Sequence, residues 1–287
     1  MKIKIKKEFK TEILVVGTGI AGLIATERAL KKRKRVCLVT NKKLCGGASY
    51  FPLKGTLGIQ VTKDKDDYER YYEDIVKMGN GMENPELIKT YISNIKNSLY
   101  LLNKIGFEPW LRKDSRPACF AKYSRDIYLI NNWKKAKERC KRKLKNHRGL
   151  NILENSTLVR IVTKDKRVVG AIFQCKQNFI FVKSKVIILA TGGVASNYKD
   201  SLYPEGINGI GHIAALDAGA IAQNMEFIQF IPAFLKPKYN VLFGEHTLKY
   251  CLGMYDLRNN LLLSGVDDEK NKELWIERSS YAPFSVD

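Results

Sequence analysis

The first 40 residues show the apolar pattern of a strand, a helix and a second strand. Residues 13–16 are consecutive apolar positions, as in a parallel strand that is covered on both faces. From Ile20 to Leu30 apolar residues recur at helical spacing, and the basic run 31–35 ends that helix before a second apolar run at 36–39. The pattern predicts one βαβ unit.

The same reading divides the rest of the chain into elements. Residues 40–60 are rich in Gly and small side chains and indicate an extended loop, and Asn84 and Pro85 are typical of an N-cap and a first helical residue. Helices are predicted over 65–107, 132–145 and 211–219. Strands are predicted at 158–162, 168–173, 179–182, 186–189 and 226–230.

Composition indicates a folded globular chain with an unusual charge. The 287 residues include 50 Lys plus Arg against 29 Asp plus Glu, a formal net charge of +21. Basic residues gather at 2–7, 31–35 and 134–145, but without the interleaved aromatic residues of a nucleic-acid module. We interpret them as solvated surface residues whose field attracts anionic ligands, and we expect no nucleic-acid partner.

Six cysteines are present, with no CxxC pair and no His at metal-ligand spacing, so no metal site is expected. We interpret them as reduced, structural thiols; Cys45 has no second cysteine close to it in the sequence. No apolar segment has the length of a signal-peptide core or of a membrane span. The sequence therefore predicts a cytoplasmic protein without a membrane span.

The turn after the first strand, at residues 17–22, reads GTGIAG. This is the G-x-G-x-x-G pattern in its required place, between a buried strand and an amphipathic helix. Gly17 permits the tight turn, Gly19 lets the backbone approach a pyrophosphate, and Gly22 allows close packing of helix on strand. The motif predicts a dinucleotide site.

Two further features indicate which class of dinucleotide the site binds. The second strand is followed by Thr40, Asn41 and Lys42, where NAD-type sites usually place an acidic residue on the ribose. A second glycine turn, ATGG at 190–193, follows the strand at 186–189. In a doubly wound sheet both turns can close on one dinucleotide. The missing acidic residue favours a ribose that is held by neutral hydrogen-bonding groups.

Together with these turns, three more segments carry a family resemblance: CGGASY at 45–50, GHIAALDAGA at 211–220 and MEFIQF at 225–230. Over residues 12–232 the chain resembles the flavoprotein family of succinate dehydrogenase, fumarate reductase and L-aspartate oxidase. The resemblance implies an α/β fold with a Rossmann-like FAD-binding domain over 1–225, a helical insertion at about 62–150, and part of a capping domain over 226–287.

The resemblance also implies a set of cofactor-binding residues around noncovalent FAD. These are Gly17, Gly19, Ile20, Ala21, Gly22, Thr40, Asn41, Lys42, Gly46, Gly47, Ala48, Ser49, Leu158, Val159, Ala190, Thr191, Gly192, Gly193, Glu226 and Gln229. Residues 45–54 contain no His, so the family's covalent link to flavin cannot form there.

Three departures from the family concern catalysis. The family's His-Pro-Thr after MEFxQF is replaced by residues 231–233, Ile-Pro-Ala, and the Asp of its Thr-Gly-Asp-Gly run is replaced by Ile210. The chain also ends at Asp287, before the segments that supply the family's catalytic Arg. These departures predict a fragment or a shortened relative.

Hydride transfer between a dicarboxylate and flavin needs cations that hold the carboxylates and a group that exchanges a proton. Arg278, Arg258 and His246 are the predicted catalytic residues, and Arg125 is a further candidate for the clamp.

The sequence thus favours an FAD-dependent oxidoreductase that acts on a small organic, dicarboxylate-like substrate, with an electron-transfer partner as a possibility. Two alternatives remain open. One is an incomplete FAD-binding module that needs a missing C-terminal half or a partner chain, and the other is a basic nucleic-acid binder.

Overall fold

The computed structural model describes residues 4–50, 57–115, 117, 121–130, 132–145 and 147–228, together with 233–234, 236, 241–242, 253, 255–261, 267 and 269–270. The chain divides into two compact units. Unit 1 comprises Met1–Thr56, Asn97–Pro109 and Ile130–Ile228, and unit 2 comprises Leu57–Lys96, Trp110–Leu129 and Gln229–Asp287.

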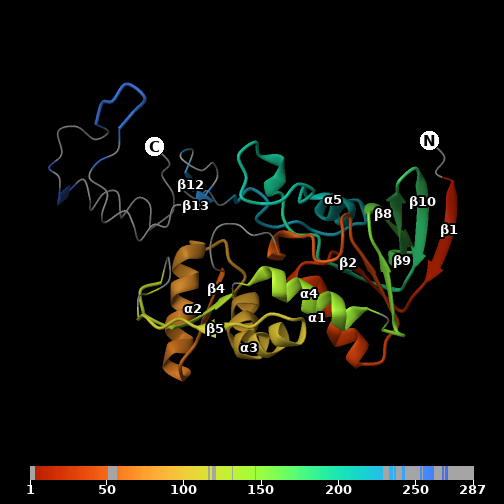
Figure 1. The fold of residues 1–287 in the computed structure, drawn as a ribbon, viewed down its shortest axis with the longest axis horizontal. Coiled ribbons are helices and arrows are strands. Elements are labelled where there is room, and N and C mark those ends of the chain that lie inside the picture. The colour runs from red at the N-terminus through yellow and green to blue at the C-terminus, as the bar shows by residue number, and fades with distance from the viewer. Residues whose placement is uncertain are drawn as a thin grey trace. The chain divides into compact units, whose positions relative to one another are not determined.

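The centre of unit 1 is a parallel four-stranded sheet in the order β11-β2-β3-β7. Its strands are β2 (Ile13–Val16), β3 (Val36–Val39), β7 (Leu150–Leu153) and β11 (Val186–Leu189). Between β2 and β3 runs α1 (Ile20–Lys31), as the apolar pattern predicted (Figure 1). The N-terminal βαβ unit is therefore confirmed.

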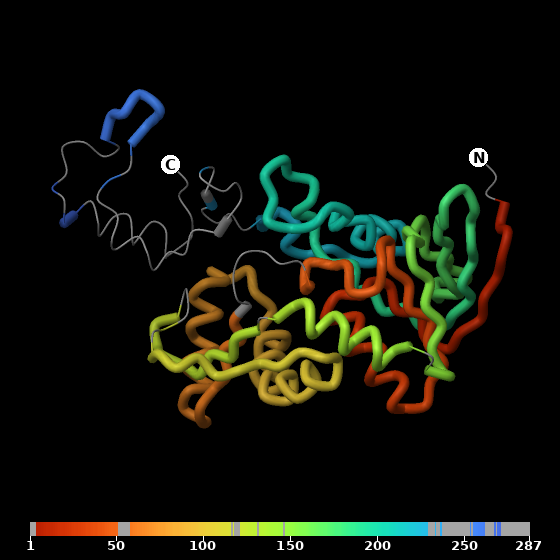
Figure 2. The backbone as a smooth tube through the Cα atoms, viewed as in Figure 1, coloured from red at the N-terminus to blue at the C-terminus, as the bar shows by residue number. Residues whose placement is uncertain are grey.

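A second sheet in unit 1 has the order β1-β10-β9-β8. Strands β8 (Ser156–Lys164), β9 (Arg167–Cys175) and β10 (Asn178–Lys183) form an antiparallel meander, close to the predicted runs. The edge strand β1 (Ile5–Lys10) pairs in parallel with β10 and lies beside it in Figure 2. The apolar pattern did not predict β1, because its side chains are largely exposed and no apolar alternation marks it.

The main core of unit 1 lies between these sheets. Alternation in β2 and β3 sends Leu14, Val16, Cys37 and Val39 to this core, where they meet side chains of β8, β9 and β10 such as Phe173. On the other face of the parallel sheet, α1 packs against β2 and β3. Both faces are covered, which explains why the two strands are continuously apolar.

Other elements of unit 1 lie around the strand ends. They are the 3-10 turns η1 (Ala48–Tyr50) and η2 (Ala195–Asn197) and the helices α4 (Trp133–Leu144) and α5 (Ile210–Asp217). Helix α4 falls within the predicted insertion at about 62–150 but belongs to unit 1. The domain boundaries drawn from the sequence therefore stay a prediction.

Unit 2 contains the two predicted helices of the region 65–107, although α3 ends beyond the unit boundary. Asn84 Oδ1 accepts hydrogen bonds from the N–H groups of Glu86 (3.1 Å) and Leu87 (3.2 Å), so the predicted N-cap is confirmed. The elements are β4 (Leu57–Val61), α2 (Lys65–Gly79), α3 (Pro85–Lys104), β5 (Trp110–Leu111), β6 (Asp126–Ile130), β12 (Ala233–Phe234) and β13 (Val241–Leu242).

The strand predicted at 226–230 was wrong in its described part, residues 226–228. Asn224 has a left-handed backbone conformation (φ 58°), and the Phe227 N–H donates to its carbonyl at 3.4 Å, so the chain turns here. Phe230 lies outside the described residues. Within the described part of the chain, no helix combines the length and apolarity that crossing a bilayer requires.

Candidate functional site

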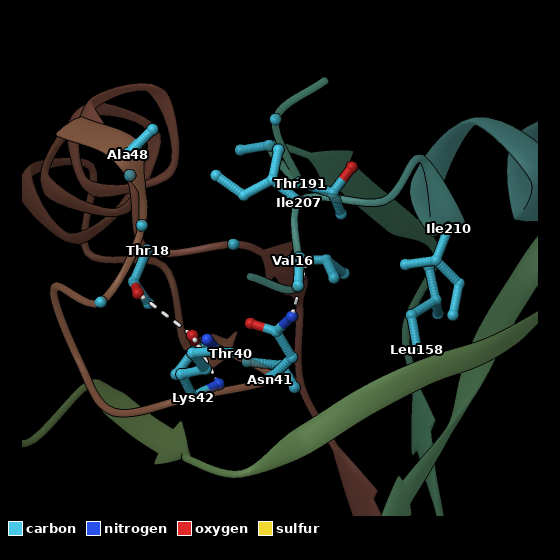
Figure 3. A pocket seen from close by; sticks show the side chains of 18 of the residues that line it. Val16, Thr18, Thr40, Asn41, Lys42, Ala48, Leu158, Thr191, Ile207 and Ile210 are labelled. Carbon is cyan, nitrogen blue, oxygen red and sulfur yellow. Dashed lines mark hydrogen bonds between the residues drawn. The ribbon is translucent and has the colours of Figure 1, made fainter. Parts of the chain in front are cut away.

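A cavity of about 220 Å³ lies where β2, β3 and β11 end, at their carboxyl ends (Figure 3). All its lining residues belong to unit 1. They are Val16, Gly17, Thr18, Gly19, Ile20, Ala21, Val39, Thr40, Asn41, Lys42, Gly46, Gly47, Ala48, Ser49, Ser156, Thr157, Leu158, Ala190, Thr191, Gly192, Glu205, Gly206, Ile207 and Ile210. Ligands of open α/β sheets bind at this edge of the sheet.

The two glycine turns predicted to close on one ligand do meet at this cavity. Gly17 has φ +113°, and a Cβ there would overlap the carbonyl oxygen of Ala190. A Cβ at Gly22 would overlap the Gly17 carbonyl oxygen and touch the Ala190 methyl group. Glycine is therefore required at both positions by contact with neighbouring backbone, and at Gly17 also by its backbone conformation.

The N-terminus of α1 opens onto the cavity. Its N-cap is Gly19, which offers no side-chain acceptor, and the first turn contains no acidic residue. The Ile20 N–H donates to Ser49 Oγ at 3.0 Å, which places the loop after β3 beside this turn. The free N–H groups and the helix dipole leave partial positive charge at this end, which favours an anion such as a pyrophosphate.

Polar side chains follow the end of β3 on another wall of the cavity. The buried Thr18 hydroxyl donates to Thr40 Oγ1 at 3.2 Å, the bond drawn in Figure 3. Lys42 N–H also donates to Thr40 Oγ1, at 3.4 Å. These bonds fix a neutral hydroxyl where other nucleotide folds present a carboxylate, as the sequence indicated.

A segment far along the chain completes this wall. The Asn41 side-chain amide donates to the Gly206 carbonyl at 3.0 Å, across 165 residues of sequence. This contact brings Glu205 and Ile207 to the cavity, and Ile210 follows at the start of α5. Sequence reasoning missed these residues because no local pattern marks a contact between segments so distant.

The glycine-rich loop after β3 is tied to the end of β7. Glu154 Oε1 accepts the Leu44 N–H at 2.7 Å, and its Oε2 pairs with Lys43 Nζ at 3.1 Å. The Leu44 hydrogen bond, helped by Lys43, lowers the pKa of Glu154. The carboxylate thus holds the start of the segment that carries Gly46 to Ser49.

Most of the predicted cofactor-binding residues line the cavity, and several do not. Gly22 is buried behind its wall, and Gly193 is not part of it. Val159 follows Leu158 along β8, where alternation turns it away, and it is 37% exposed. Glu226 is exposed on the turn described above and does not line the cavity. Gln229 lies outside the described residues.

The predicted catalytic residues are not brought to the cavity in the described part of the chain. Arg258 is exposed in a turn where its N–H donates to Asp256 at 2.8 Å. His246 and Arg278 lie outside the described residues. Among the residues that line the cavity, Lys42 is the single cationic side chain.

Arg125, the further candidate for the carboxylate clamp, is buried in unit 2. Its side chain has 0% exposure and pairs with Asp67 at 2.8 Å and Asp74 at 2.6 Å. The guanidinium also lies over the Tyr71 ring, 4.4 Å from its centroid. These contacts join Arg125, which directly precedes β6, to two carboxylates of α2.

Comparison with known proteins gives a family match over residues 12–246, to the FAD binding domain. L-aspartate oxidase of Clostridium perfringens is 26% identical over 240 residues, which are 79% of this chain and 52% of that protein. An FAD-dependent oxidoreductase of Methanocaldococcus jannaschii is 28% identical over 230 residues, 78% of this chain and 42% of that protein. The chain thus spans about half the length of the curated relatives that it matches.

The fold is shared with solved flavoproteins. A flavocytochrome c3 fumarate reductase in its open conformation superposes with a TM-score of 0.73 at 23% identity, over 94% of this chain and 51% of that one. The predicted α/β class and the predicted family resemblance are both confirmed.

The cavity fits the nucleotide part of FAD. Its glycine turns leave backbone N–H groups facing a hollow, and Gly19 and Gly47 present no side chain to it, with their α-carbons on facing segments. A Cβ on either glycine would project between these segments, where a pyrophosphate needs close approach of the backbone. With the match covering most of its length, this chain belongs to the FAD binding domain family.

Proposed function

We propose that this protein is an oxidoreductase in which FAD exchanges a hydride with a small organic acid of dicarboxylate type. The observation that carries the proposal is the single cavity at which both glycine turns, the N-terminus of α1 and the loop 46–49 meet. Two proteins that it resembles are named as an L-aspartate oxidase and a fumarate reductase, both of which are named for four-carbon dicarboxylates.

The residues of the cavity divide by role. The N–H groups at Gly19 and Ala21 would face the pyrophosphate, and Thr40, Asn41 and Lys42 would hold the ribose end. When bound, FAD supplies a hydride acceptor or donor that protein side chains lack. Leu158 and Ile207 supply apolar surface that excludes water. No residue in 45–54 is a His, so we propose that FAD is held noncovalently.

The substrate contacts are proposed to come from the remainder of the chain. Lys42 is the only cation that lines the described cavity, and one ammonium group does not hold two carboxylates. Arg278, Arg258 and His246 therefore remain the proposed catalytic residues. We further propose a cytoplasmic location, a separate electron acceptor, and no nucleic-acid partner.

An incomplete FAD-binding module is the second candidate. It is favoured by two observations. The matched region spans about half of the length of the relatives, and Glu226 is exposed on a turn. In this case a further segment or a partner chain would complete the substrate site.

Flavin content and anaerobic reduction separate the two. Purified protein is expected to be yellow and to release flavin on denaturation. Addition of L-aspartate or succinate without oxygen should then bleach the flavin, and fumarate should restore the colour of dithionite-reduced protein. Flavin that binds but responds to none of these acids supports the incomplete module, and protein that takes up no added FAD contradicts both candidates.

A further inference from the structure

Two cysteines that are 95 positions apart in sequence, Cys45 and Cys140, come together beneath the cofactor loop. Cys45 precedes Gly46 in the loop and is fully buried, and Cys140 is buried on α4 with 1% exposure. Their thiols lie close enough to influence each other's pKa. The structure thus supplies the second thiol that the sequence around Cys45 lacks.

The surrounding packing holds α4 against this loop. The Tyr50 ring lies 5.0 Å from the Phe107 ring, and the Phe107 ring lies 6.1 Å from that of Trp133, at the start of α4. Helix α4 also contacts η1 directly. The turn η1 continues from the residues of the loop that line the cavity. A covalent change at Cys45 would therefore alter the position of those lining residues.

Cys140 is reached from a second cavity, of about 360 Å³, in unit 1. Apolar side chains of α1 and α4 form part of its wall, and the basic side chains Lys31, Lys104, Lys143 and His147 line the rest with Glu27. A small neutral oxidant can therefore approach Cys140, whereas Cys45 lines neither cavity.

Charge makes Cys140 the more reactive member of the pair. Interaction with the Cys45 thiol, helped by Lys143 and Lys141, lowers the pKa of the Cys140 thiol although burial opposes this. The hydrogen bond to Cys140 and burial raise the pKa of the Cys45 thiol. Because Cys140 lines the second cavity and Cys45 lines neither, Cys140 is the thiol that an oxidant reaches and would react first.

We propose that Cys140 and Cys45 form a peroxide-sensitive thiol pair that closes into a disulfide. The Cys140 sulfur attacks one oxygen of hydrogen peroxide, the O–O bond breaks and hydroxide leaves, which gives a sulfenic acid. The Cys45 sulfur then attacks the Cys140 sulfur, and the S–O bond breaks. Both thiols are oxidised, and with their two protons the peroxide is reduced to two molecules of water.

The disulfide would fasten the start of the cofactor loop to α4. Its mark on the structure is slower hydrogen exchange at residues 46–50, because the loop loses the freedom to move away from the helix. This consequence is measured without any enzymatic activity, so it holds or fails independently of the function proposed above.

The test treats the purified chain with hydrogen peroxide and maps its peptides by mass spectrometry. A linked peptide pair that contains Cys45 and Cys140, with loss of two hydrogens and reversal by dithiothreitol, is the expected product. A disulfide that joins either residue to another cysteine, or oxidation without any link, overturns the proposal. This experiment uses the native sequence and needs no variant to fold.

Variants assign the order of the steps. In Cys45→Ser the sulfenic acid at Cys140 has no resolving thiol, so a dimedone label should accumulate there. Cys140→Ser should lower the rate at which hydrogen peroxide oxidises the thiols of the chain by about tenfold, because it removes the activated thiol. Cys175→Ser, on β9 in the second sheet of unit 1, is the matched control and should leave the link unchanged. In the native sequence, a dimedone label on Cys45 in place of Cys140 would contradict the proposed order of the two steps.

Discussion

Gly17 combines two restrictions that are usually found apart. Its φ of +113° is unfavourable for any residue with a Cβ, and a Cβ there would overlap the Ala190 carbonyl oxygen. We expect Gly17→Ala to lower the free energy of unfolding by about 2–4 kcal/mol, because strain and overlap add. Denaturant unfolding measures the loss, and FAD titration should show binding weakened by at least about tenfold.

Gly219 is the matched control in the same unit. It also has a positive φ (+92°), but a Cβ there would meet nothing within 4 Å. Gly219→Ala therefore carries the backbone strain alone and should lose about 1 kcal/mol, with FAD affinity unchanged. Equal losses in the two variants would show that the contact with Ala190 does not matter.

Glu154 is expected to control the cofactor loop in a pH-dependent way. Its folded pKa is lowered, so its tether is present above the ordinary pKa of about 4.3 and is lost as the pH falls through the folded value. Glu154→Gln keeps the shape but removes the charge, and it should weaken FAD binding about three- to fivefold at neutral pH. The measurement is the rate of FAD release, compared at neutral and at acid pH.

Glu12 provides the comparison for Glu154. It too accepts a backbone N–H, from Arg35 at 2.9 Å, and its pKa is lowered, but Arg35 precedes β3 and does not belong to the loop that carries Gly46 to Ser49. Glu12→Gln should leave the release of FAD as it is in the native protein. If both variants release FAD alike, the effect comes from lost surface charge and not from the loop.

At the scale of elements, the sequence predicted the strands whose burial produces a clear apolar pattern. Strands β2 and β3 were found because apolar residues run without interruption where both faces are covered, and β11 shows the same apolar run although Val186 and Leu189 are exposed. Exposed β1 left no such mark, and the apolar residues of 226–228 suggested a strand where the left-handed Asn224 makes a turn. Local pattern fails where side chains stay in solvent.

The helix α2 and the strand β6 depend on one buried cation. Arg125 pairs with Asp67 and Asp74, and its side chain is fully buried. Arg125→Met would remove the cation from both carboxylates, although Asp67 keeps the hydrogen bond from the Lys63 N–H at 3.0 Å, and should cost about 3–5 kcal/mol in the unfolding of this region. Hydrogen exchange over 65–79 reports the change.

The exposed pair of Lys89 and Glu86, 3.0 Å apart in the same unit, is the control for Arg125. Lys89→Met should change stability by less than about 0.5 kcal/mol, because exposed pairs contribute little. FAD affinity should stay within about twofold in both variants, since the cavity lies in unit 1. A large loss of FAD binding in Arg125→Met would instead return this residue to the list of candidates for the site.

For the whole molecule, the site is assembled by contacts that no local pattern contains. The glycine turns, Thr40 and the loop 46–49 could be predicted because each follows a recognisable strand or matches a family motif. Glu205 and Ile207 could not, because the bond between Asn41 and Gly206 joins segments 165 residues apart. The pairing of Cys45 with Cys140 was hidden for the same reason.

This assembly leads to a prediction about where FAD stabilises the chain. A ligand that binds only the folded state stabilises it by about 2.7 kcal/mol at a hundredfold excess over Kd. Because every residue that lines the cavity lies in unit 1, hydrogen exchange should slow on FAD addition over 13–50 and 186–217 and stay nearly constant over 65–79.

The same experiment with Gly17→Ala protein shows whether that protection needs the glycine turn, since FAD at the same concentration should then slow exchange over 13–50 and 186–217 less than in the native chain. Equal protection of both units in the native chain would mean that they unfold together. Protection confined to 65–79 would place the ligand away from the cavity, and the assignment of FAD to the strand ends would be wrong.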